Sequence, residues 1–236
     1  SPYFDDFTED KKFHRVMYRP AFAVQARELT TQQSILQNQI EKLGDSMYKH
    51  GSMVIPGEVT YDLNHFSIKL TSFTGTLANF TDTVITGGTS GVTATVKSVA
   101  ATDGTDPNTL FVKYSNSGTD NVSASFTDGE TITSSASTGE TAVVSSSHTG
   151  CAAFIDAGTY YINGFFVEVD SQSLILDKYT NTPDYRVGLT VTENFITSTD
   201  DTSLLDNATG SSNANATGAH RFKITLTLAK LSLTST

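Results

Sequence analysis

Residues 21–47 read AFAVQARELTTQQSILQNQIEKLGDSM, and this stretch decides the architecture of the chain. Apolar or small side chains recur in it at alternating intervals of four and three residues, and one glutamine falls in the same series. The series is Phe22, Ala26, Leu29, Gln33, Leu36, Ile40, Leu43 and Met47. A mean spacing of 3.5 residues is typical of a coiled-coil seam. We therefore expect a helix over residues 21–50 that forms an oligomer interface.

The heptad positions follow from this spacing. Leu29 falls at position d and Gln33 at position a, where a polar residue sets the register at some cost in stability. Pro20 suits the first turn of a helix, and Gly44 and Gly51 are expected to loosen or end it. An amphipathic helix packed on its own β domain is the alternative. Leucine at d favours a dimer, and the spacing alone does not distinguish two strands from three.

The residues before the helix form a separate region, residues 1–20. It carries aromatic side chains among charged ones and is too polar to fold alone. We expect it to be an arm that docks on a neighbouring protein. The predicted docking residues are Tyr3, Phe4, Phe7 and Phe13.

The residues after the helix change to strand patterns. Residues 51–74 and 150–236 are predicted to form one β domain, of sandwich or barrel type. Asn163-Gly164 lies between two runs of strand-forming residues, and this dipeptide is the strongest short signal for a hairpin. Arg221 to Leu233 alternates as an edge or interface strand. The predicted fold is mainly β with a long N-terminal helix.

Residues 75–149 differ in composition, being rich in Thr, Ser and Gly, and they contain an internal repeat. Residues 80–82 (Phe-Thr-Asp) lead to a glycine turn at Gly91, and residues 126–128 repeat the tripeptide before a turn at Gly139. Each copy is predicted to form strand, turn, strand. We interpret the block as a small inserted all-β domain of about six strands, since two copies are too few for a solenoid.

Composition narrows the possible functions. The formal net charge is −10 and the 15 basic residues are scattered, which is unlike a nucleic-acid groove. No apolar run is long enough for a membrane span, and no signal peptide is visible. The single cysteine, Cys151, allows no intrachain disulfide and is expected to be a small buried side chain. The chain lacks an initiator methionine and is expected to be a processed piece of a longer protein.

Two groups of acidic residues are candidate sites. Asp103, Asp106 and Asn108 lie in a turn whose oxygens suit Ca²⁺, but the closing Glu of a calcium loop is missing, which favours a plain turn. Asp200 and Asp201 are candidate acids for glycoside hydrolysis, but the sequence places no partner carboxylate. No catalytic motif, metal-ligand spacing or cofactor loop is present. We therefore predict no enzyme activity, no metal and no cofactor.

Several segments resemble a family of large virion structural proteins of tailed bacteriophages, notably phages of cyanobacteria and other marine bacteria. The resemblance covers residues 1–74 and 150–236, and residues 75–149 look like a module inserted in phage tail proteins. It is carried by Phe13–Pro20, Val24–Thr30, Ile35–Glu41, Tyr161–Val167, Leu176–Tyr179, Tyr185–Leu189, Leu204–Ala208 and Gly218–Ile224.

The resemblance implies a baseplate or tail-fibre component in the virion, assembled in the host cytoplasm and without enzymatic activity. It also favours a homotrimer, because phage fibres are commonly three-stranded, and it implies other tail proteins as partners. Two alternative functions stay open. One is an adhesin whose 75–149 block binds a host receptor or surface glycan, and the other is a depolymerase.

Overall fold

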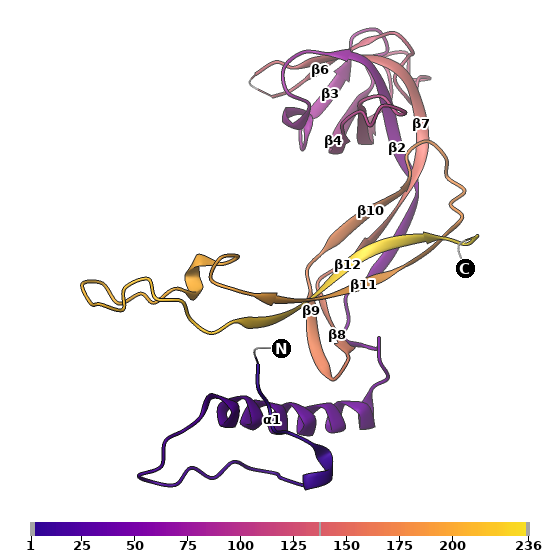
Figure 1. Ribbon diagram of the computed structural model, residues 1–236. Helices are drawn as coiled ribbons and strands as arrows, with labels where there is room; N and C mark the ends of the chain where they lie inside the picture. The colour runs from indigo at the N-terminus through magenta and orange to yellow at the C-terminus, as the bar shows by residue number, and fades with distance from the viewer. Residues whose placement is uncertain (1–2, 137, 235–236) are drawn as a thin grey trace. The chain divides into compact units, whose positions relative to one another are not determined.

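The computed structural model describes residues 3–136 and 138–234, which form a mainly β protein with one α-helix near the N-terminus (Figure 1). This much of the predicted fold is confirmed. The chain divides into two compact units. Unit 1 comprises the residues up to Glu58, Asp156–Gln172 and Leu189–Thr227, and unit 2 comprises Val59–Ile155, Ser173–Gly188 and the residues from Leu228 on.

Unit 1 contains the helix α1 (Ala26–Met47), a 3-10 turn η1 (Glu9–Lys11) and a three-stranded antiparallel sheet. The order in this sheet is β1 (Met53–Ile55), β8 (Gly158–Ile162), β9 (Phe165–Val169). Ile162 pairs with Phe165, which leaves Asn163 and Gly164 as a two-residue turn with φ of 48° and 84°. Asn and Gly tolerate this left-handed backbone better than other residues. The hairpin predicted from the Asn-Gly pair is therefore confirmed.

A two-stranded ribbon follows in the sequence, made of β11 (Tyr185–Ile196) and β12 (Arg221–Ser232). The part of it from Leu189 and up to Thr227 belongs to unit 1. The loop between the strands contains a 3-10 turn, η3 (Thr202–Leu204), and one isolated bridge between Leu205 and Thr217. Apart from these, the polar loop expected between the strands carries no regular structure among its residues.

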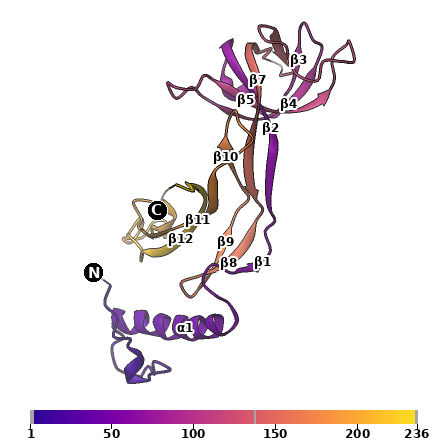
Figure 2. The same ribbon diagram turned by 90° about the vertical axis from the view of Figure 1, so that its right-hand side faces the viewer.

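Unit 2 is built on a seven-stranded antiparallel sheet in the order β10-β7-β2-β5-β4-β3-β6, with a further pairing of β6 with β7. The pairings of six of these strands close into a ring, from β2 through β5, β4, β3, β6 and β7 back to β2. Figure 2 shows the shorter strands gathered at one end of the long β2–β7 pair. The strands are β2 (Val59–Phe73), β3 (Val84–Gly87), β4 (Thr93–Ala100), β5 (Thr109–Asn116), β6 (Thr131–Ser134), β7 (Thr141–Ile155) and β10 (Gln172–Asp177).

The internal repeat is visible as two equivalent hairpins, β3–β4 and β6–β7, and the predicted pattern of strand, turn, strand is confirmed. The two copies pair with each other through equivalent residues, because Thr86 lies opposite Thr133. The corresponding side chains of both copies are fully or almost fully buried in one core. They are Phe80 and Phe126, Ile85 and Ile132, Ala94 and Ala142, and Val96 and Val144.

A buried carboxylate holds the turn of the first copy. Glu130 is only 4% exposed, and it accepts hydrogen bonds from the backbone N–H groups of Thr89, Ser90 and Thr127 and from the Ser90 hydroxyl, at 2.7–3.0 Å. Burial alone would raise the pKa of Glu130, but the four donors outweigh it and lower that pKa. The ionised carboxylate of Glu130 thus connects the turns of the ring inside unit 2.

The structure places the domain limits differently from the sequence pattern. The limit expected between residues 149 and 150 falls inside β7, and β2 runs to Phe73, directly before the 75–149 block. The pairing of β2 with β7 extends from Val59–Ile155 to Phe73–Ala142. The Thr/Ser-rich block therefore shares one sheet with its flanking strands, because two long strands carry the hydrogen bonding across both limits.

Candidate functional site

Helix α1 begins later than predicted, at Ala26 instead of residue 21. Gln25 adopts an extended backbone and forms a capping box with Glu28, in which each side chain accepts from the other residue's backbone N–H. This reciprocal capping satisfies two N–H groups that a helix start otherwise leaves unpaired. Phe22, predicted to be in the helix, therefore precedes it, and its ring lies 4.7 Å from the Arg19 guanidinium carbon.

One face of α1 packs on the β8–β9 hairpin of unit 1. The Tyr161 hydroxyl lies 2.9 Å from the Glu41 carbonyl oxygen and 2.8 Å from a carboxylate oxygen of Asp45, and the Gln37 amide donates to the Gly164 carbonyl at 2.8 Å. Burial and the bond to Asp45 raise the pKa of Tyr161 to about 12. This face fixes the helix to its own chain.

Gly44 lies at the centre of that contact, and the expectation that it loosens or ends the helix was wrong. The helix continues to Met47, because the missing side chain makes room for the ring of Tyr161. A Cβ on Gly44 would lie 2.7 Å from Cζ of that ring. The glycine is thus a packing residue, whereas the sequence suggested a helix breaker.

A second face of α1 binds the N-terminal arm, which runs alongside the helix (Figure 1). Asp5 accepts hydrogen bonds from the hydroxyls of Thr31 and Ser34. Glu9 accepts from the Asn38 amide at 2.6 Å and forms an ion pair with Lys42 at 3.4 Å. Burial opposes ionisation of Asp5, but its hydrogen bonds outweigh burial and lower its pKa.

The arm is therefore held by its acids, a contact that the sequence reasoning missed. A signal for it exists in the sequence. Four polar residues recur on the helix at intervals of four, three and four, parallel to the apolar series, and three of the four acids of the arm contact them. The polar series is Arg27, Thr31, Ser34 and Asn38, and the three acids are Asp5, Asp6 and Glu9.

The remaining face of α1 is the predicted seam, and none of the described residues covers it. All eight seam residues are exposed, and the six large apolar ones are between 45% and 65% exposed. Ile35, on another face, is by contrast buried. The structure brings the seven seam residues of the helix onto one open stripe. We call this stripe the seam face: Ala26, Leu29, Gln33, Leu36, Ile40, Leu43 and Met47.

The four aromatic residues predicted for partner docking are not equivalent in the structure. Phe4 and Phe13 are 74% and 61% exposed, while Phe7 is half-buried. The Tyr3 ring stacks on Phe195 of β11, with ring centroids 5.0 Å apart. Tyr3 thus contacts its own unit, and Phe4 and Phe13 are the most exposed of the four predicted docking residues.

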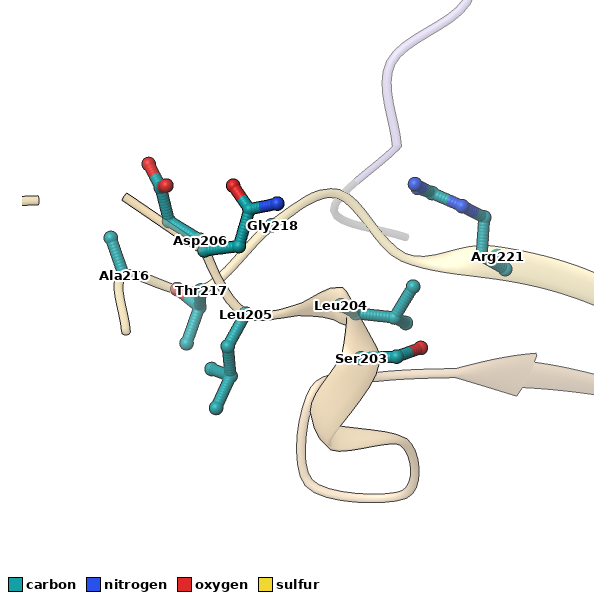
Figure 3. A pocket seen from close by; sticks show the side chains of 9 residues that line it. Ser203, Leu204, Leu205, Asp206, Ala216, Thr217, Gly218 and Arg221 are labelled. Atoms are coloured by element: carbon teal, nitrogen blue, oxygen red, sulfur yellow. The ribbon is translucent and has the colours of Figure 1, made fainter. Parts of the chain in front are cut away.

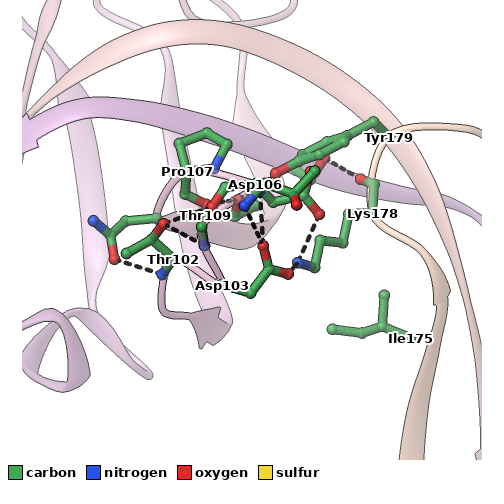
Figure 4. Close-up of polar contacts among 12 residues, drawn as sticks. Thr102, Asp103, Asp106, Pro107, Thr109, Ile175, Lys178 and Tyr179 are labelled. Atoms are coloured by element: carbon green, nitrogen blue, oxygen red, sulfur yellow. Dashed lines mark hydrogen bonds and ion pairs between the residues drawn. The ribbon is translucent and has the colours of Figure 1, made fainter.

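The acidic turn weighed for Ca²⁺ instead surrounds a lysine (Figure 4). The Lys178 ammonium lies 2.9 Å from a carboxylate oxygen of Asp103 and 2.8 Å from one of Asp106. Hydrogen bonds from Asp106 N–H and Lys178 hold the pKa of Asp103 well below its usual range, and both aspartates raise the pKa of Lys178. Asn108 accepts from the Thr102 N–H. The turn is closed by an ion pair within unit 2.

The acids weighed for hydrolysis serve local turns in unit 1. Asp200 accepts from the N–H and hydroxyl of Thr197, and Asp201 caps η3 by accepting from the Ser203 N–H. These bonds lower the pKa of both carboxyls, opposite to the raised pKa of a general acid. The neighbouring loop encloses a shallow pocket next to Arg221 (Figure 3).

The described residues contain no group of three or more His, Cys, Asp or Glu side chains placed to hold a metal ion. No helix among residues 3–136 and 138–234 has the length and apolar character needed to cross a membrane. Cys151 is a buried free thiol in a small core with Ala153 and Leu176, as predicted.

The fold and the seam face define a mainly β protein with one capped, amphipathic helix whose apolar stripe is open. The chain belongs to the family described as "Domain of unknown function (DUF4815)", whose model matches residues 1–124 and 105–235. No curated protein and no solved structure matches the chain.

Proposed function

We propose that the protein is a non-enzymatic structural subunit that self-associates through the seam face of α1. The observation that carries the proposal is that the faces of this helix differ in what covers them. The β8–β9 hairpin and the arm cover two faces of the helix, while the face that carries the largely apolar 3.5-residue repeat stays exposed. A repeat of this period is self-complementary between parallel helices. The natural occupant of the seam face is therefore the same face of a second copy.

The energetics favour association. Full burial of an apolar side chain contributes about 1.5–3 kcal/mol, and the large seam side chains, which are 45–65% exposed, gain roughly half of that on association. Gln33 lies among these side chains at position a and would fix the register at some cost in stability. The chain itself occupies one flank, because Gln37 and Gly44, both at position e, contact the β8–β9 hairpin. The hairpin thus covers the e flank at these two residues, and partners contact positions a and d.

Light scattering of Leu36→Asp tests this proposal. Leu36 is more than half exposed in the single chain, so a charge there leaves the chain's own packing unchanged but disrupts a seam. We expect the mass to fall from that of an oligomer to that of one chain. Gln39→Asp, with the same charge on an exposed position outside a and d, is the matched control and keeps the oligomer. An unchanged mass for Leu36→Asp would contradict the proposal.

We propose further that the oligomer is a homotrimer and a component of a phage tail, in the baseplate or a tail fibre, attached to neighbouring tail proteins. The sequence resemblance to virion proteins supports this placement, and the exposed Phe4 and Phe13 suit attachment. We also propose that the β strands form a sandwich- or barrel-like domain, which the ring of pairings in unit 2 supports. A map of the intact virion tests the placement, and absence of the chain from purified virions would refute it.

A host-glycan adhesin is the second candidate. Glycan sites stack sugars on exposed aromatic rings, but Phe80, Phe111 and Phe126 of the 75–149 block are buried at 0–3% exposure. Their burial favours the structural function. Saturable binding of the whole protein on a glycan array would reverse this ranking.

A further inference from the structure

A groove of about 1060 Å³ lies in unit 1 beside the first turns of α1. One wall is the helix, and the other is formed by the N-terminal arm and the β11–β12 ribbon. The groove opens on the seam face, since Ala26, Leu29 and Gln33 line it. It is therefore continuous with the proposed interface.

The helix wall has a specific composition. Its four residues are Ala26, Leu29, Thr30 and Gln33, at heptad positions a, d, e and the next a. In a parallel coiled coil, each seam side chain enters a hole formed by four residues of the facing helix, and for a d residue these are a, d, e and the next a. The wall is thus a complete hole for one d-position side chain. In an in-register partner that side chain is Leu29.

The far wall is aromatic. Phe195 and Phe222, on neighbouring strands of the ribbon, have ring centroids 5.7 Å apart, and Tyr3 stacks on Phe195. Phe195 and Phe222 remain 58% and 45% exposed. Two adjacent, half-exposed aromatic rings facing an apolar helix stripe are typical of the centre of a protein interface.

The charged side chains of the groove and His220 already have partners within unit 1. Asp5 is bound by Thr31 and Ser34, as described above, His220 is hydrogen-bonded to Tyr3, and the Arg221 guanidinium donates to the Ala219 carbonyl at 2.8 Å. A charged ligand therefore finds no cluster of open charges here, whereas an apolar side chain finds an apolar hole.

We infer that this groove receives the helix of a second copy, with its Leu29 in the hole and its flank against Phe195 and Phe222. The inference rests on the proposed self-association and extends it, because it adds the β11–β12 ribbon to an interface that the heptad pattern assigns to the helix alone. The ribbon then fixes the side from which the partner approaches, at the e flank beside Thr30.

Photo-crosslinking in mixed oligomers tests the inference. Chains that carry p-benzoylphenylalanine in place of Phe222 are mixed with ¹⁵N-labelled wild-type chains, irradiated and digested with trypsin. Label in a crosslinked peptide shows that it comes from the second copy. We expect labelled residues 28–42, which contain Leu29, to be captured. The same photoreactive residue in place of Phe4, which is exposed but does not line the groove, serves as the background control.

The outcomes separate this inference from the proposed function. If wild type is oligomeric and the probe at Phe222 captures only unlabelled peptides, or labelled peptides outside residues 28–42, the inference is overturned and self-association stands. If wild type is a single chain by light scattering, both fall. As a second measurement, Phe195→Ser should weaken association about tenfold or more. An unchanged dissociation constant would also overturn the inference.

Discussion

The ring of unit 2 buries its apolar side chains, whereas the helix of unit 1 leaves a series of them exposed. In the ring, Leu110 and its neighbours are fully buried by strands of the same chain. On α1, Leu43 and the other large apolar side chains of the series are 45–65% exposed, although they are equally apolar. A closed set of strands can bury its own inner face, whereas one helix with an apolar stripe needs another surface. The difference indicates which part folds alone and which part assembles.

Matched leucine truncations give the largest expected contrast between the two regions. Leu110→Ala should lower the free energy of unfolding by about 2–5 kcal/mol, because it leaves a cavity in the ring. Leu43→Ala should change mainly how the unfolding midpoint depends on protein concentration. Urea unfolding at several concentrations, followed by circular dichroism, measures both. Equal losses for the two leucines would show that Leu43 is packed within its own chain as Leu110 is.

The second largest effect on the free energy of unfolding is expected for Glu130, the carboxylate buried in the ring. Glu130→Gln should cost about 1–3 kcal/mol, because an amide places donors against N–H groups that need an acceptor. The pKa of Glu130 is lowered in the folded state, so its contribution is present above the unfolded value of 4.5 and is lost as pH falls through the lower folded pKa. The urea midpoints of wild type and variant should therefore differ most at about pH 7, and the difference should shrink as the pH falls below 4.5.

Glu168→Gln is the control for this titration, because Glu168 is exposed on β9. Its urea midpoint should follow wild type at both pH values. If Glu130→Gln and wild type differ by the same amount at low pH as at neutral pH, the ionised carboxylate is not what stabilises the turn.

Gly44→Ala tests how the helix is held to its own chain. Alanine is the better helix former by about 1 kcal/mol, but its Cβ would collide with the Tyr161 ring, and overpacking costs about 1–3 kcal/mol. We therefore expect a net loss in thermal stability of unit 1. In a Tyr161→Leu background the same substitution should become neutral or stabilising. A stabilising effect in the wild-type background would show that the helix is not packed on the hairpin as described.

The smallest effect is expected at the surface of unit 2. Lys178→Met removes both ion pairs of the Asp103 turn, which are partly exposed and screened by salt. Melting temperatures at low and high salt should show a small loss that shrinks as salt increases. A loss comparable to that of Leu110→Ala would mean that this turn belongs to the folding core.

Much of the fold is readable from short-range patterns. The Asn163-Gly164 turn, the repeat around Phe80 and Phe126, and the strands flanking them are local signals, because turn chemistry and strand alternation act over a few residues. The helix limits were misplaced since Gln25 is an unusual capping residue. The contacts of Asp5 with Thr31 and Ser34 join residues far apart in the sequence. A pattern of neighbouring residues does not indicate which distant side chains meet, so these contacts could not be predicted.

The sequence by itself determined the heptad series on residues 21–47, the hairpin and the repeat, because each depends on a periodicity or a turn written in consecutive residues. Only the tertiary structure decided which face of the helix stays open. It showed that Gly44 accommodates the Tyr161 ring and that acids of the arm bind a second face. Those contacts depend on which side chains meet in space, and what they leave uncovered is the seam face.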